Sequence, residues 1–178
     1  MISKAAVSDD SMRLFLLYFI VGIFILLLQS TLLHLLPFGP VVPDLVLVLC
    51  VYLGLHHPTM GAAVGCFLLG YSVDVMSSRL LGVNAFAMTL VFLAVYCSSR
   101  AIWLQNPLVS SLIVLLAAMV KGAALVLVWA IFLSLDGFWI GAARYIMSEA
   151  LLAAVLAPLV FALLRRGETY VRKFNPGV

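Results

Sequence analysis

The stretch PDLVLVLCVYLGLH, residues 43–56, constrains how the rest of the chain can be arranged. It is almost entirely apolar, opens with Pro43 and Asp44, and is followed closely by Pro58. Proline fixes its own φ and disfavours helix in the residue before it, so these prolines bound one helix. At about 1.5 Å per residue the helix covers about 20 Å, less than the roughly 30 Å hydrocarbon core of a bilayer. We therefore expect it either to be embedded among neighbouring helices or to thin the bilayer locally.

The composition of the chain is that of a membrane protein. Of its 178 residues, 66% are hydrophobic and only 10% are charged, and the mean hydropathy is +1.25. Soluble domains are about 45–50% apolar, and a soluble fold has too little interior to hide this much apolar side chain. The solvent must therefore be lipid, and the chain is predicted to be a polytopic membrane protein. Its Lys and Arg residues form no basic stripe, so we expect no nucleic-acid partner.

Six apolar runs, separated by turn-forming residues, predict six membrane helices. The fold class we expect is all-α, a six-helix transmembrane bundle that forms one integral-membrane domain over residues 1–178. The first run exceeds the 7–15 residues usual in a signal peptide and no A-x-A-like site follows it, so it is predicted to remain as a helix. The predicted helices together occupy residues 14–164, between tails at 1–13 and 165–178; the six runs are 14–36, 44–56, 59–76, 81–99, 108–135 and 145–164.

The distribution of Lys and Arg predicts the orientation in the membrane, because cytoplasmic segments carry an excess of these residues. With the N-terminus in the cytoplasm, the inner segments hold seven of them and the outer loops hold two. Both termini are therefore predicted to be cytoplasmic. The inner residues are Lys4, Arg13, Arg100, Arg165, Arg166, Arg172 and Lys173, and the outer ones are Arg79 and Arg144.

Asp74 lies near the predicted outer end of the third helix, in an otherwise apolar run. Gly70 precedes it by one turn, and Gly61 and Gly65 form a GxxxG pattern beside it. Small residues let helices approach closely in lipid, so we expect this face to pack against protein. Three interpretations of the carboxylate remain open. It pairs with Arg79 at the helix end, it faces a partner or ligand, or it reaches interfacial water.

Asp44 is predicted to be a structural cap. It follows Pro43 at the start of the second helix. Asp is a strong N-cap residue, and its negative charge suits the N-terminal end of the helix dipole.

Lys121 lies near the middle of the fifth helix, where an ammonium group costs a few kcal/mol on insertion scales. Contact with Glu149, about a turn into the sixth helix, or with Asp74 would neutralise both charges. We predict a structural ion pair of Lys121 and Glu149 inside the bundle, and a proton or solute relay is the alternative. The alternative interpretation of Glu149 is a first-turn acid stabilised by the helix dipole.

Sequence patterns typical of enzymes and metal sites are absent. The chain has no GxSxG, HExxH or P-loop pattern. Its three cysteines form no CxxC pair, and its three histidines lack the i, i+4 spacing of a metal site. We therefore expect no catalytic residue, no metal and no cofactor. A small integral-membrane lipid enzyme remains as a further alternative.

The order of motifs over about residues 40–100 resembles the family of rod shape-determining proteins MreD. In that family a Pro-Asp pair opens an early helix and a short cytoplasmic turn follows. A glycine-rich helix then ends in G-x-x-x-D, and a Leu-Gly pair starts the next helix. The matching residues here are Pro43, Asp44, Gly65, Gly70, Asp74, Leu81 and Gly82.

The resemblance implies a non-enzymatic, multi-pass component of the bacterial inner membrane, acting in cell elongation and cell-shape determination. The partners it implies are the single-span protein MreC, the wall-synthesising glycosyltransferase and transpeptidase, and the actin-like MreB filament, in direct or indirect contact. The family is also similar in fold to the substrate-binding membrane subunits of vitamin transporters. That likeness supports the alternative function of a small-molecule binding subunit or transporter.

Overall fold

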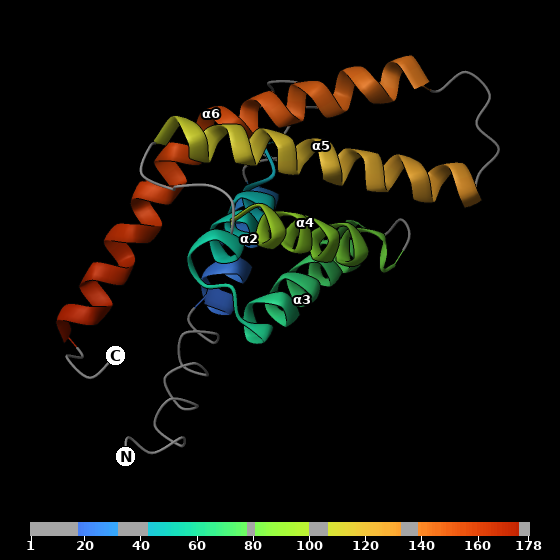
Figure 1. Ribbon diagram of the computed structural model, residues 1–178. Helices are drawn as coiled ribbons and strands as arrows, with labels where there is room; N and C mark the ends of the chain where they lie inside the picture. The colour runs from blue at the N-terminus through green and yellow to red at the C-terminus, as the bar shows by residue number, and fades with distance from the viewer. Residues whose placement is uncertain (1–17, 32–42, 78–80, 100–106, 133–138, 175–178) are drawn as a thin grey trace.

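The computed structural model describes residues 18–31, 43–77, 81–99, 107–132 and 139–174, and these contain six helices and no strand (Figure 1). The all-helical prediction is confirmed for this part of the chain. The helices are an N-terminal helix Tyr18–Thr31, α2 Leu45–His56, α3 Met60–Ser77, α4 Val83–Ser99, α5 Pro107–Phe132 and α6 Trp139–Phe174.

α2 is the buried centre of the molecule. Each residue from Val46 to Leu55 is buried, and the helix contacts α3, α4, α5 and α6. It also lies against the N-terminal helix, where Gly22 approaches the side chain of Leu49. A helix that is apolar all round is stable only when it is covered on every side. Of the two alternatives for this short helix, the structure therefore shows the embedded one.

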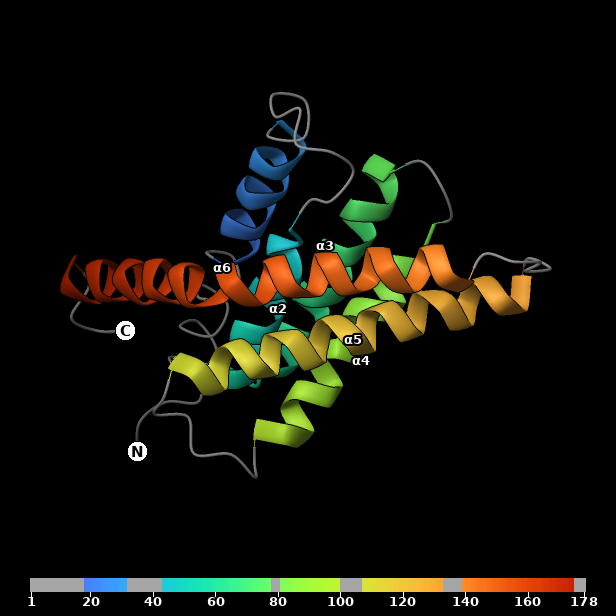
Figure 2. The same ribbon diagram turned by 90° about the horizontal axis from the view of Figure 1, so that it is seen from above.

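Four of the other helices form two antiparallel pairs around α2, and the N-terminal helix packs against it separately. α5 and α6 run side by side as a long hairpin, α3 pairs with α4, and α4 also packs directly against α5 (Figures 1 and 2). Small residues permit the close approach within the hairpin. A Cβ at Gly122 of α5 would lie 2.4 Å from the Ile146 side chain of α6. Ala150, Ala153 and Ala157 of α6 are buried as well.

α6 is longer than the sequence predicted. It runs from Trp139 to Phe174, whereas we expected the last helix at residues 145–164 and a tail from residue 165. The helix continues because the tail lacks a strong breaker between Arg165 and Phe174 apart from Gly167. It contains Pro158, which removes a backbone hydrogen bond, and Figure 1 shows the helix bending before its red C-terminal part.

Two helical segments are long and apolar enough by themselves to cross a membrane, namely Val109–Val128 and Ile146–Gly167. The other four described helices are apolar but shorter. α2, with 12 residues, is the shortest of them. Among the four short helices only α2 is covered throughout by its neighbours, whereas the other three expose large apolar side chains.

α3 and α4 approach each other closely at Gly70. A Cβ added there would lie 2.7 Å from the carbonyl oxygen of Asn84 and 2.8 Å from the Cα of Ala85. Both contacts are to backbone at the start of α4, which cannot move aside as the end of a side chain can. The glycine thus sets the distance between the two helices.

We expect Gly70→Ala to lower the free energy of unfolding by about 1–3 kcal/mol, because a methyl group must be forced between two backbones. Gly167→Ala is the matched control, since no atom lies within 4 Å of a Cβ there. It should leave stability unchanged or raise it slightly, because alanine favours helix. Unfolding of the detergent-purified protein by SDS titration measures both. Equal stability of the two variants would contradict the close approach.

Candidate functional site

Asp44 is the N-cap of α2. One carboxylate oxygen, Oδ1, accepts a hydrogen bond of 3.0 Å from the backbone N–H of Leu47. This bond satisfies one of the N–H groups that a helix leaves free in its first turn. The side chain is buried, so the capping charge is held away from water.

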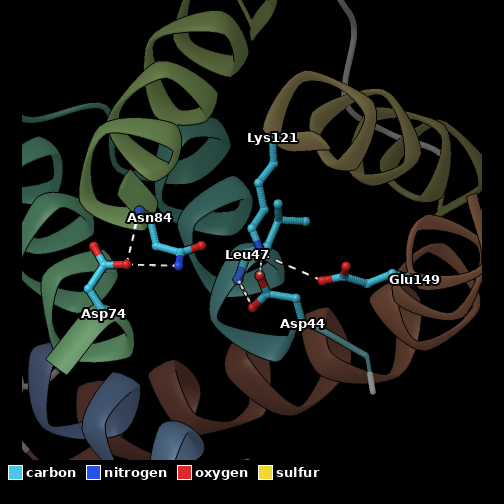
Figure 3. Close-up of polar contacts among 6 residues, drawn as sticks. All are labelled: Asp44, Leu47, Asp74, Asn84, Lys121 and Glu149. Atoms are coloured by element: carbon cyan, nitrogen blue, oxygen red, sulfur yellow. Dashed lines mark hydrogen bonds and ion pairs between the residues drawn. The ribbon is translucent and has the colours of Figure 1, made fainter. Parts of the chain in front are cut away.

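Lys121 of α5 neutralises that charge. Its Nζ donates to Oδ2 of Asp44, and it also reaches Oε1 of Glu149 at 3.5 Å (Figure 3). Asp44, Lys121 and Glu149 come from α2, α5 and α6, and we refer to them together as the charge cluster. The structure thus brings Lys121 and Glu149 together, adds Asp44 to the pair, and leaves Asp74 apart on α3.

The charge cluster connects the short central helix to both long helices. Asp44 and Lys121 have only 9% and 10% of their side-chain surface exposed, whereas Glu149 has 20%. Removing one member of a buried ion pair costs about 3–5 kcal/mol, because the partner is left charged in a medium of low dielectric constant. Each member of the cluster therefore depends on the others.

A small cavity lies beside the charge cluster. Its volume is about 60 Å³, which is room for a few water molecules. The three charged residues form its polar wall, and α5 and α6 contribute an apolar wall that includes Gly122 and Ile146. Within the described part of the chain no group of His, Cys, Asp and Glu side chains could hold a metal ion.

Asp74 caps α4 from the neighbouring helix. It is 2% exposed, and its two oxygens accept four hydrogen bonds of 2.8–3.1 Å. The donors are the backbone N–H groups of Gly82, Asn84 and Ala85 and the side-chain amide of Asn84. Figure 3 shows the contacts between Asp74 and Asn84. These backbone groups lie at the start of α4, where free N–H groups favour a negative charge.

This arrangement bears on the three interpretations of Asp74. The carboxylate is occupied at the start of α4, so a partner or ligand would have to displace that helix to reach it. Arg79, the pairing residue of another interpretation, lies outside the described residues. Sequence reasoning missed Asn84, although its position just after Gly82 at a helix start is typical of a capping region.

The remaining glycines of the predicted packing face differ in their surroundings. Gly65 is buried and Gly61 is half-buried on α3. Gly82 has a φ of +94° in the turn before α4, a conformation that other residues adopt only with strain. Binding of another protein through these glycines stays a prediction.

The opposite end of α2 carries an aromatic contact that the sequence did not suggest. The rings of Tyr52 and His56 stack with centroids 4.4 Å apart, and Phe161 of α6 meets Tyr52 edge-on at 5.2 Å. Arg165 of α6 donates to Nε2 of His56 at 3.2 Å. Both ends of α2 are therefore tied to α6, one by charge and one by aromatic rings.

Comparison with known proteins identifies one family. The model of the family described as rod shape-determining protein MreD matches residues 10–167. Neither the curated proteins nor the solved structures gave a match. The matched segment contains the charge cluster as well as Asp74 and Asn84.

We expect Lys121→Met to lower the free energy of unfolding by about 3–5 kcal/mol, because it leaves Asp44 and Glu149 without their cation. Adding Asp44→Asn should recover part of the loss, since asparagine still caps the helix but carries no charge. SDS titration of the single and double variants measures the coupling. Costs that simply add would contradict the ion pair.

Asp74→Ala is expected to destabilise the protein by about 2–4 kcal/mol, because it removes the acceptor for several buried N–H groups at once. Ser72→Ala is a control on the same helix, since the hydroxyl of Ser72 is exposed and bonds only to the carbonyl of Leu68. The same SDS titration compares the two. A cost for Asp74→Ala no larger than that for Ser72→Ala would show that the cap of α4 contributes nothing.

Proposed function

The chain belongs to the MreD family of rod shape-determining proteins, whose model covers most of its length, and from this premise we propose that it is a non-enzymatic membrane component of the bacterial cell-elongation complex. In this proposal it lies in the inner membrane with six transmembrane helices and both termini in the cytoplasm. It binds an MreC-like single-span protein and supports peptidoglycan synthesis by the glycosyltransferase and transpeptidase. An MreB-like filament is a direct or indirect partner.

The observation that carries the proposal is that the buried charged side chains in the described part of the chain contact groups of the same chain. Asp44, Lys121 and Glu149 contact one another, and Asp74 caps a helix of the same chain. Such groups stabilise a scaffold, whereas catalysis needs a nucleophile and a base aimed at a substrate. Each described helix except α2 exposes large apolar side chains, the kind of surface that lipid or the helices of other membrane proteins cover.

The proposed membrane topology rests on the sequence and on the packing together. Seven Lys and Arg residues against two favour the cytoplasmic side for both termini. α2 ends at a tight turn at His57 and Pro58, and its burial among the five other described helices supports a bundle built around it. The loops between the helices are too short for a catalytic domain.

The alternative of a vitamin-type binding subunit draws no support from the described cavity. Small-molecule pockets usually measure about 300–1,000 Å³, and the cavity beside the charge cluster has about 60 Å³. Within its polar wall, Lys121 already contacts both Asp44 and Glu149. Scaffolding therefore accounts for the charge cluster better than solute binding does.

Depletion of the protein in its native host should convert rods into spheres that lyse, because wall synthesis along the cylinder would lose its membrane scaffold. Cell width and length by phase-contrast imaging, with the growth medium held constant, measure the change. Re-expression of the wild-type chain is the control and should restore rods. Cells that stay rod-shaped but require a nutrient supplement would refute the proposal and favour the transport alternative.

A further inference from the structure

We propose that the side of α6 at Glu149 is the docking site for a transmembrane helix of a partner protein, and that this helix brings a cationic side chain to the charge cluster. The inference rests on the proposed function and specifies where the single-span partner binds and what chemistry it carries.

The first support is an imbalance of charge. The cluster contains two carboxylates and one ammonium group. Asp44 has both oxygens engaged, one by Leu47 N–H and one by Lys121. Glu149 is held only through Oε1, at 3.5 Å, and its other oxygen makes no hydrogen bond within the described part of the chain. With all three groups ionised, one negative charge is left over, and Glu149 is the carboxylate with the weaker contact to Lys121.

A charge left over inside a bilayer is costly, and polar groups at such depth usually find a partner. Glu149 belongs to the membrane-length segment Ile146–Gly167, and Lys121 belongs to Val109–Val128. The cavity wall next to Glu149 is mostly apolar, so it screens the charge poorly. A cation supplied from outside the chain would complete the neutralisation that Lys121 begins.

The second support is access from the side of the bundle. Glu149 lies at the edge of the buried face of α6, since Ala150 and Ala153 are fully covered while Leu152 is 40% exposed. Leu152 is three residues further along and so lies on the same side of the helix as Glu149. A partner helix packed over Leu152 would place a side chain at the free oxygen of Glu149.

The third support is the size of the cavity. About 60 Å³ suits the head group of one side chain, such as an ammonium or guanidinium group, and is far below the volume usual for a small-molecule site. A free inorganic cation would neutralise the charge but would leave the exposed apolar surface around Leu152 uncovered. A cationic side chain carried by an apolar helix also uses the apolar surface around Leu152.

The test is co-purification with the host's own MreC-like protein from native membranes. Glu149→Gln removes the excess charge and keeps the size of the side chain, and it should reduce retention of the partner about tenfold. Glu168→Gln is the matched control. It makes the same change on the same helix just beyond the membrane-length segment, and it should leave retention unchanged.

A second measurement needs no change in the charge cluster. A photo-crosslinking residue at Leu152 should form an adduct with the partner, and one at Leu93, which is 56% exposed on α4, should not. Adducts with lipid alone, or with a second copy of this chain, would overturn the inference. So would full retention by the Glu149→Gln variant.

The outcomes separate this inference from the proposed function. If the wild-type chain retains its partner but crosslinks to it only from Leu93, the docking site is wrong and the scaffold function stands. If the wild-type chain retains no MreC-like protein at all, both fail. A thermal unfolding profile of the Glu149→Gln variant that matches the wild type shows that any loss of retention reflects binding.

Discussion

The fold depends on how the start of a short, fully buried helix is stabilised. α2 has only 12 residues. Its N-cap, Asp44, contacts Lys121 of the membrane-length segment Val109–Val128, and Lys121 contacts Glu149 of the segment Ile146–Gly167. The free N–H groups in the first turn of α2 need an acceptor, and Asp44 supplies one. The carboxylate in turn needs a cation, because it is cut off from water, and Lys121 supplies it from α5. One capping requirement thus determines where α5 and, through Glu149, α6 must lie.

Two buried carboxylates are stabilised here in different ways. Asp74 has four hydrogen-bond donors at the start of α4, whose helix dipole also favours a negative charge. Asp44 has a single backbone donor and relies on Lys121 for the rest. A carboxylate with many fixed donors needs no other charge, whereas one with few must recruit a cation. This difference explains why a lysine is found at Asp44 and none of the described cations approaches Asp74.

Local features were predictable from the sequence, and features that depend on the pairing of distant helices were not. The start of α2 at Asp44 followed from Pro43 and the apolar run behind it, and the embedding of α2 was one of two outcomes set by its length. The pairing of Lys121 with Asp44 joins residues 77 positions apart, and no spacing rule indicates such a contact. One interpretation of the sequence pairs Asp74 with the nearby Arg79. In the described structure its hydrogen-bond donors are backbone N–H groups and the Asn84 amide at the start of α4. The length of α6 was underestimated because hydropathy falls at Arg165 while helix propensity does not.

Charge also bears on how a protein of this kind can recognise another helix. In lipid there is no hydrophobic force between helices, so packing and polar contacts decide which helices associate. A lipid-facing surface of leucine and valine offers little to distinguish one partner from another. A carboxylate that is only 20% exposed, beside a small cavity, is more selective, because it favours a helix that carries a cation at the same depth in the membrane. In the docking that we propose, Lys121 reduces the cost of keeping that carboxylate in the membrane, and the charge that it leaves unmatched favours binding of a cationic partner helix.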